Sequence, residues 1–220
     1  MNKKFSVYLN SKIKKFNNTI YVEGDKSISH RSLMIASQCM GISSIKGILE
    51  SEDIDNTINC LKALGVRILK KNKSYLVYGN GLGSFRKPSK KNLYCGNAGT
   101  LVRLLSGLLT TSNFKTKLTG DKSLKKRPMK RIIDPLSKIG ANFFPKKKTT
   151  LPLSIEGTNL PLAQKFEEKI GSAQIKSSIL LASLNTPGIT TIERLWLRHQ
   201  WRLFDHGHHD SAGIDPVSGL

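Results

Sequence analysis

Cysteine is scarce in this chain of 220 residues. Cys39, Cys60 and Cys95 stand 21 and 35 residues apart, and no two of them form a Cys-x-x-Cys pair. This spacing argues against a zinc site and against a disulfide framework. Because free cysteines are usually buried, the sequence predicts three buried thiols in a reducing compartment.

Long apolar runs are also lacking. No stretch approaches the roughly 18 apolar residues that span a bilayer, and no signal-peptide core follows the basic first residues. A composition of 38% hydrophobic and 23% charged residues is that of a folded globular chain. We therefore expect a soluble cytoplasmic protein with no membrane partner.

Acidic residues are few, since 15 Asp and Glu face 36 Lys and Arg, which gives a net charge of +21. Such a basic balance raises the question of nucleic-acid binding. The lysine doublets are scattered, however, and no aromatic residues interleave with them as a base-stacking platform would require. Zinc-finger, RNP and basic-zipper patterns are missing as well. We favour a Lys-rich solvated surface and small anionic substrates over nucleic acid.

The body of the chain repeats itself. An apolar stretch rich in small residues, followed by a short alternating strand, begins at Arg31, again at Arg103 and again at Ser177. The first two copies continue into an amphipathic helix that ends at Gly65 or Gly140, and then into further strands. This pattern predicts an α/β (α+β) fold built from units of about 70 residues.

A short polar turn precedes the first helix of each repeat, over residues 24–31, 96–100 and 171–177. Free N–H groups at a helix start, together with lysine and arginine, are the donors that phosphate and carboxylate prefer. At the first turn the alternative is a simple helix cap with solvent-facing Ser and Lys. A fourth segment, 125–129, places cations before a helix whose first turn should contain Pro128. If the turns converge, they form one anion pocket.

Nucleophile sets of the Ser-His-Asp or Cys-His kind are not recognisable. His30 lies beside the first turn, and we assign it no role. We place no carboxylate of the body as a general base.

The composition changes abruptly after Glu193. All 27 lysines lie at or before Lys176, whereas both tryptophans and four of the five histidines lie beyond Glu193. The third repeat breaks off at the same point. We therefore expect residues 194–220 to be an unrelated tail that arose by frameshift or fusion. Its His- and Asp-rich segment, 205–210, has metal-ligand chemistry but no frame to hold it, so we predict no metal.

The turns together resemble the motifs of the 5-enolpyruvylshikimate-3-phosphate synthase family. Residues 24–31 are similar to its Gly-x-Lys-Ser-x-Ser-x-Arg signature, and residues 96–103 match Gly-Asn-Ala-Gly-Thr-x-x-Arg. Residues 118–121 with 127–129, and then 172–177, follow in the family's order. Ala173, between Ser172 and Gln174, is typical of the family's Ser-Ala-Gln branch.

The resemblance implies an inside-out barrel of repeated β-α-β-α-β-β units in two domains. Residues 1–20 would be a lead-in strand region. Residues 21–193 would be the first domain, nearly complete, with two full repeats and a broken third. The second domain would be missing.

The resemblance also implies a reaction and its residues. The family transfers the enolpyruvyl group from phosphoenolpyruvate to the 5-hydroxyl of shikimate-3-phosphate in the shikimate pathway, without metal or organic cofactor. Lys26 would be catalytic and would contact both substrates, with Arg103 in support. By motif position, shikimate-3-phosphate would be bound by Lys26, Ser27, Arg31, Ser172 and Gln174, and phosphoenolpyruvate by Lys26, Asn97, Gly99, Arg127 and Gln174.

The family's remaining catalytic groups lie in its second domain, and nothing after Glu193 matches them. We therefore expect the chain as written to be inactive or nearly so, and monomeric as the family usually is. Two alternatives stay open. One is a relative of the enzyme that adds enolpyruvate to UDP-N-acetylglucosamine, which shares the fold but lacks the Lys-Ser-x-Ser-x-Arg turn. The other is a non-catalytic anion-binding remnant.

Overall fold

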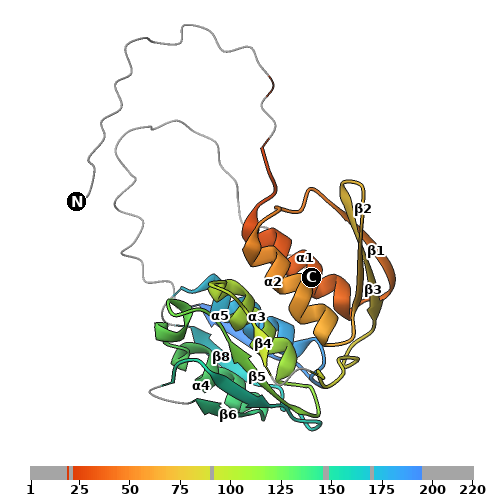
Figure 1. Ribbon diagram of the computed structural model, residues 1–220. Helices are drawn as coiled ribbons and strands as arrows, with labels where there is room; N and C mark the ends of the chain where they lie inside the picture. The colour runs from red at the N-terminus through yellow and green to blue at the C-terminus, as the bar shows by residue number, and fades with distance from the viewer. Residues whose placement is uncertain (1–18, 20–21, 90–91, 146–148, 169–170, 195–220) are drawn as a thin grey trace, which may run out of the picture.

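The structure is a computed structural model that describes residues 19, 22–89, 92–145, 149–168 and 171–194 (Figure 1). The predicted lead-in region 1–20 and the predicted tail 194–220 lie almost entirely outside the described residues. Those two predictions remain predictions.

Helices and strands follow one another along the chain in the order that the repeats require. The helices are α1 (Lys26–Gln38), α2 (Glu52–Ala63), α3 (Gly99–Leu109), α4 (Lys130–Ile139) and α5 (Ala173–Ser183), with a short 3-10 turn, η1 (Leu124–Lys126). The strands are β1 (Met40–Lys46), β2 (Arg67–Lys71), β3 (Ser74–Asn80), β4 (Leu93–Tyr94), β5 (Lys115–Thr119), β6 (Asn142–Pro145), β7 (Leu153–Glu156), β8 (Lys165–Glu168) and β9 (Thr191–Arg194).

The second repeat is described in full and defines the unit as β4-α3-β5-α4-β6-β7. Its sheet has the order β4-β5-β7-β6, in which β4 and β5 are parallel and the other pairs are antiparallel. The first repeat forms the antiparallel order β1-β3-β2. In the third, β8 pairs with β9 in parallel, as β4 pairs with β5. The predicted repeat is therefore present in the described residues.

Both second helices end where the sequence predicts. α2 stops at Ala63, just before Gly65, and α4 stops at Ile139, where Gly140 is the cap. The two glycines have φ of 93° and 122°, a region that favours glycine because other residues clash there.

The core is centred on α3, which lies beside α5 (Figure 1). Leu101, Leu104 and Leu105 of α3 are fully buried. Gly107 lets the two helices approach closely, because a Cβ there would collide with the backbone oxygen of Ser178 on α5. The helix contact thereby fixes the start of α5 relative to the start of α3.

Two local predictions are wrong. Pro128 precedes α4, which begins at Lys130 with Met129 as its cap, so the proline is not in the first helical turn. Cys39 is exposed at the end of α1, whereas Cys60 and Cys95 are buried as predicted. Within the described residues, no helix combines the length and apolar character that crossing a membrane requires.

Candidate anion-binding site

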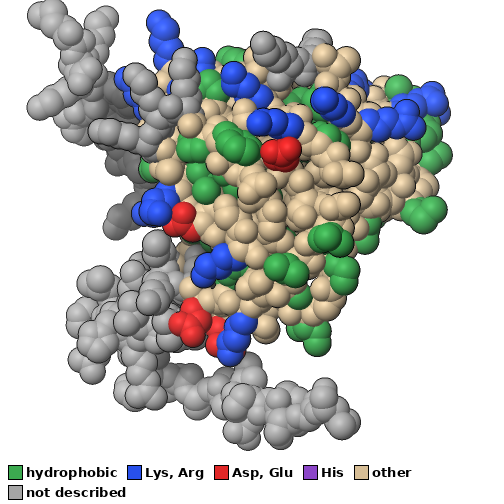
Figure 2. Space-filling view, turned by 90° about the horizontal axis from the view of Figure 1, so that it is seen from below, with side chains coloured by type: hydrophobic (Ala, Val, Ile, Leu, Met, Phe, Trp, Pro, Cys, Tyr) green, Lys and Arg blue, Asp and Glu red, His purple; other side chains and the backbone are tan. Residues whose placement is uncertain are grey.

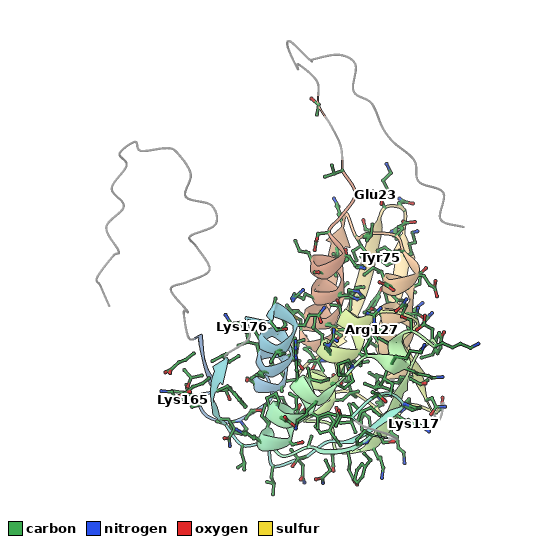
Figure 3. All side chains as sticks on the ribbon, turned by 90° about the vertical axis from the view of Figure 1, so that its left-hand side faces the viewer. Glu23, Tyr75, Lys117, Arg127, Lys165 and Lys176 are labelled. Atoms are coloured by element: carbon green, nitrogen blue, oxygen red, sulfur yellow. The ribbon has the colours of Figure 1, made fainter. Side chains whose placement is uncertain are left out.

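The polar turns converge on one pocket of about 460 Å³. It lies where the starts of α1, α2, α3 and α5 meet the segment just before α4. Its lining consists of Lys26, Ser27, Asp53, Asn97, Gly99, Thr100, Arg103, Arg127 and Gln174. Figure 3 shows Arg127 in the middle of the molecule, while Lys117 and Lys165 lie at its margins.

The first turn delivers a lysine to the pocket. Asp25 caps α1 by accepting a hydrogen bond from the Ile28 backbone N–H at 2.8 Å, which fixes where the helix begins. Lys26, the first residue of the helix, places its ammonium 3.2 Å from the carboxylate of Asp53 on α2. That pair is partly exposed, so it orients the lysine more than it stabilises the fold.

The second turn brings backbone and guanidinium together. Gly99 begins α3, and a Cβ on it would lie 2.9 Å from Nη1 of Arg127, closer than side chains tolerate. Arg127 donates from Nη2 to Oδ1 of Asn97 at 2.6 Å. Glycine at position 99 therefore lets an arginine from the η1–α4 segment lie against the helix start.

The third turn supplies an amide that links two elements. Ser172 caps α5 by accepting a hydrogen bond from the Ile175 N–H. Gln174 accepts a hydrogen bond from Arg103 and donates one to the hydroxyl of Thr100 at 3.0 Å. The amide thus fixes the guanidinium of Arg103 and the start of α3 at once.

Cations outnumber carboxylates in the pocket. Burial, and then the nearby charges of Arg127 and Arg131, lower the pKa of Arg103. An arginine keeps its charge at neutral pH all the same, so the like charges stay close together, with Asp53 as the one carboxylate among the described residues that line the pocket. An arrangement of this kind favours a bound anion.

Seven predicted site residues line the pocket, and two do not. Arg31 extends to α5, where its guanidinium donates to Oγ of Ser177 at 2.8 and 3.1 Å. It also donates to the carbonyl of Ser27 on α1 at 3.0 Å. Ser172 lies beside the pocket as the cap of α5. Both hold the turns that the pocket is made of.

Sequence reasoning missed two lining residues, Asp53 and Thr100. Asp53 faces Lys26 across the pocket. The acidic first turn of α2, which contains Glu52, Asp53 and Asp55, was the available signal. Sequence alone does not show which of the three carboxylates faces the lysine.

His30 lies behind the pocket and is fully buried. Its Nδ1 is 2.7 Å from the hydroxyl of Thr57, which itself donates to the carbonyl of Asp53 at 3.1 Å. The imidazole nitrogen is therefore assigned as the donor to Thr57. Burial lowers the pKa of His30 to about 4, against an opposing effect of Asp53, so the ring is neutral.

Among the described residues, no group of three or more His, Cys, Asp and Glu side chains is placed to hold a metal ion. The His-rich segment 205–210 lies outside the described residues.

Fold and pocket together define a class: a repeated α/β protein whose helix starts converge on one pocket rich in cationic side chains. Residues 10–200 match the sequence profile of the family described as EPSP synthase (3-phosphoshikimate 1-carboxyvinyltransferase). The chain belongs to this family, as the turn motifs predicted.

Similar proteins agree with this assignment. The 3-phosphoshikimate 1-carboxyvinyltransferase of Paramagnetospirillum magneticum is 45% identical over 200 residues, which are 90% of this chain and 45% of the relative. That of Thermoanaerobacter pseudethanolicus is 48% identical over 174 residues, 79% of this chain and 40% of the relative. The solved EPSP synthase of Acinetobacter baumannii is 40% identical with a TM-score of 0.76, over 80% of this chain and 40% of that one. The chain spans less than half the length of these relatives.

Proposed function

We propose that the pocket binds shikimate-3-phosphate and phosphoenolpyruvate, and that it forms part of the site where enolpyruvyl is transferred to the 5-hydroxyl with release of phosphate. This would be a step of the shikimate pathway, which leads to aromatic amino acids. The observation that carries the proposal is the convergence of Lys26, Arg103 and Arg127 on one pocket. The similarity to 3-phosphoshikimate 1-carboxyvinyltransferases supports the choice of reaction.

Both proposed substrates carry phosphate and carboxylate groups, which guanidinium groups bind through paired N–H donors. Arg127 would bind phosphoenolpyruvate, with its fork aimed by Asn97. Arg103 would support it, aimed by Gln174. Gly99 would allow the ligand close to the backbone at the start of α3.

Lys26 is the proposed catalytic residue and would touch both substrates. An ammonium group has three donors, and Asp53 takes one of them. The other two would face the substrates and stabilise negative charge on the reacting oxygens. A positive charge fixed in advance, in a partly dewatered site, is worth most in the transition state.

The remaining residues would hold shikimate-3-phosphate. Ser27, Ser172 and Gln174 would donate to its oxygens. Arg31 would act at the edge of the site, because it ties the carbonyl of Ser27 and the hydroxyl of Ser177 together. No metal or organic cofactor is part of this proposal.

Titration of the 220-residue chain with shikimate-3-phosphate and, separately, with phosphoenolpyruvate, followed by calorimetry, tests the proposal. The measurement is binding because the chain spans less than half of its relatives' length. We expect millimolar binding of each ligand. Lys26→Met should weaken the binding of both at least tenfold, and Arg127→Gln should weaken the binding of phosphoenolpyruvate at least tenfold. A tenfold loss corresponds to about 1.4 kcal/mol, within the range for a charged hydrogen bond.

Lys87→Gln is the matched control, since Lys87 is exposed and is not among the residues that line the pocket. It removes one positive charge, as the other two variants do. Equal weakening in all three variants would assign the binding to general charge and would contradict the proposal.

We further propose that the chain works in the cytoplasm, without self-association and without nucleic acid. On the face seen in Figure 2, Lys and Arg side chains stand in separate groups with other side chains between them. This distribution supports a small anion, because a nucleic-acid backbone is bound by a continuous basic stripe.

A further inference from the structure

A hollow of about 910 Å³ lies between α4, α5 and β8. In Figure 1 these elements lie on the opposite side of the molecule from β1, β2 and β3. Among the described residues, the hollow and the anion pocket share no lining residue. Small-molecule sites in proteins enclose about 300–1,000 Å³, so the hollow is large enough to hold a ligand.

The floor of the hollow is apolar. Phe166 of β8 is 7% exposed, and Ile175 and Ile179 of α5 are 8% and 2% exposed. Pro135 of α4 lines the same hollow. A flat aromatic ring can contact a phenyl ring and aliphatic side chains at once, and burying it removes apolar area from water. The floor therefore favours an aromatic group in the ligand.

Charged side chains surround the floor, and more of them are positive than negative. They are Lys130, Arg131, Asp134, Lys138, Lys165 and Glu167. The ammonium of Lys130 lies 3.0 Å from a carboxylate oxygen of Asp134. That of Lys165 lies 2.7 Å from a carboxylate oxygen of Glu193. In the part of the chain that the structure describes, the other two cations form no ion pair.

These two cations lie on the face of α4 that borders the hollow. Arg131, Pro135 and Lys138 have the spacing i, i+4 and i+7, which places them on one helix face. Burial, and then the charges of Arg127 and Arg131, lower the pKa of Arg103, so Arg131 stands in the positive field of the anion pocket. An anion bound at Arg131 would relieve part of that repulsion.

The corresponding junction of the first repeat is closed. There the second helix, α2, packs on the first strand of the next repeat, β4, and the Cys60 thiol donates to the carbonyl of Tyr94 at 3.4 Å. A Cβ on Gly96, just after β4, would lie 2.3 Å from the side-chain nitrogen of Asn56. α4 stands in the same relation to β8, and a hollow separates them. The opening is therefore specific to this junction and is not a feature of the repeat.

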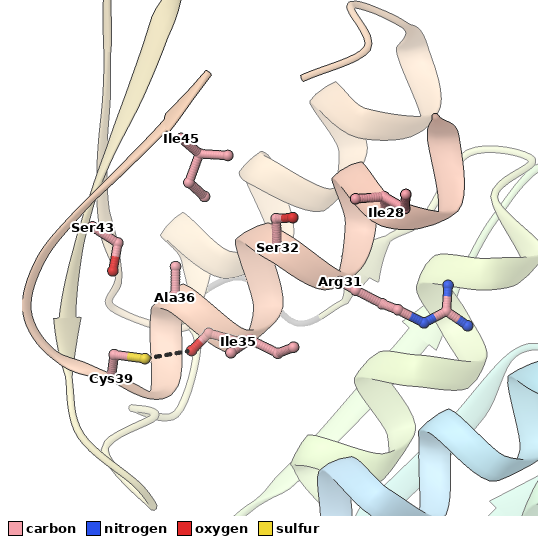
Figure 4. A pocket seen from close by; sticks show the side chains of 8 residues that line it. All are labelled: Ile28, Arg31, Ser32, Ile35, Ala36, Cys39, Ser43 and Ile45. Carbon is pink, nitrogen blue, oxygen red and sulfur yellow. Dashed lines mark hydrogen bonds between the residues drawn. The ribbon is translucent and has the colours of Figure 1, made fainter. Parts of the chain in front are cut away.

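A second hollow, of about 480 Å³, lies beside α1 and β1 and offers a contrast (Figure 4). Arg31 is the one charged side chain among the described residues that line it. Its guanidinium donates to Ser177 on α5 and is turned away from the other labelled side chains. The apolar part of this hollow therefore lacks the neighbouring cations that the hollow beside α4 has.

We infer that the hollow between α4, α5 and β8 binds an aromatic carboxylate. The ring would lie on Phe166 and Ile179, and the carboxylate would accept paired N–H donors from the guanidinium of Arg131. Lys138, further along the same helix face, would add a favourable charge. Because both cations are exposed, the carboxylate would keep part of its hydration, and its transfer into the hollow would cost little.

Titration of the 220-residue chain with 2-naphthoate, followed by calorimetry, tests the inference. We expect a dissociation constant on the order of 100 μM, which is typical of a ligand of this size. 2-Naphthamide has the same ring and shape without the charge, and it should bind about tenfold more weakly. Arg131→Gln should weaken the binding of 2-naphthoate about tenfold and Lys138→Gln about threefold, because the guanidinium donates directly and the ammonium acts at a distance.

Lys62→Gln is the matched control. Lys62 is exposed in the last turn of α2, as Lys138 is in the last turn of α4, and its replacement removes one positive charge outside the hollow. Its affinity for 2-naphthoate should stay within about twofold of the unchanged chain. Arg127→Gln, in the anion pocket, should also leave this affinity within about twofold. Circular dichroism confirms that each variant is folded, and Lys138→Gln serves as the test if Arg131→Gln does not fold.

Four results would overturn the inference. They are no binding at 1 mM 2-naphthoate (about ten times the expected dissociation constant), equal affinity for 2-naphthoate and 2-naphthamide, equal affinity in the α4 variants and in Lys62→Gln, and loss of binding in Arg127→Gln. The last would assign the ligand to the anion pocket. Because different residues line the hollow and that pocket, the inference can hold even if the proposed reaction is wrong.

Discussion

At the scale of a single residue, the buried His30 behind the pocket makes the stability of the fold depend on pH. The pKa of His30 is lowered to about 4 in the folded protein, chiefly by burial, with Lys26 and Arg31 adding to the effect and Asp53 opposing it. The unfolded chain has the ordinary value of about 6.5. Between these two pH values the unfolded state binds the additional proton, so stability falls as the pH falls through this window.

We predict that the stability contributed by neutral His30 is fully present above about pH 6.5 and is lost toward pH 4, by about 3 kcal/mol. Urea unfolding at several pH values measures it. His30→Asn keeps a donor for Thr57 but does not titrate, so it should lack this part of the pH dependence. The prediction fails if both proteins lose the same stability, since the other carboxylates titrate alike in both.

At the scale of elements, the contact between α3 and α5 fixes the positions of the two helix starts that contribute to the pocket. Gly107→Ala raises intrinsic helix propensity by about 1 kcal/mol, so on an isolated helix it would stabilise. In the protein the new Cβ meets the backbone oxygen of Ser178, which cannot move aside as a side chain does. We predict a net loss of about 1–3 kcal/mol in unfolding free energy, typical of overpacking.

The same substitution should also weaken shikimate-3-phosphate binding, because α5 carries Gln174 into the pocket. Denaturant unfolding and calorimetry on one preparation test both effects. Ser183→Ala, near the end of α5 and away from the glycine contact, is the control and should leave ligand binding unchanged. A Gly107→Ala variant as stable as the original chain would show that the two helices separate at little cost.

The elements were largely predictable because they depend on local signals. Apolar periodicity and the terminating glycines Gly65 and Gly140 fixed the second helices, and the recurring turns indicated the pocket. Pro128 was predicted to lie in the first turn of α4, but the helix begins two residues later, at Lys130. Its cap, Met129, donates its backbone N–H to the carbonyl of Thr149, a residue 20 positions further along the chain. Local sequence does not contain that contact.

The pairing of Asp53 with Lys26 could not be predicted for a related reason. The two residues are 27 apart and lie on different helices, so their contact depends on how α2 packs on α1. His30 and Thr57, one turn further into the same interface, hold that packing. The motif therefore identified the lysine, and only the folded interface identified its partner.

Charge is the property of the whole molecule that links stability to the pocket. The net charge of +21 makes the folded state repel itself, and Arg103 and Arg127 concentrate that repulsion at one place. A dianion bound there relieves it and stabilises the folded state by RT ln(1 + [L]/Kd), about 1.4 kcal/mol at ten times Kd. For a chain of this size that corresponds to a few degrees in Tm.

We predict that sulfate raises the Tm of the chain more than chloride does at equal ionic strength, because general screening depends on ionic strength and site binding depends on the ion. Differential scanning fluorimetry measures the difference. Arg127→Gln should lose most of the sulfate-specific increment, whereas Lys87→Gln, which lowers the net charge equally, should keep it. If the two variants respond alike, the repulsion is spread over the whole surface, and the pocket is no more than one part of a uniformly basic molecule.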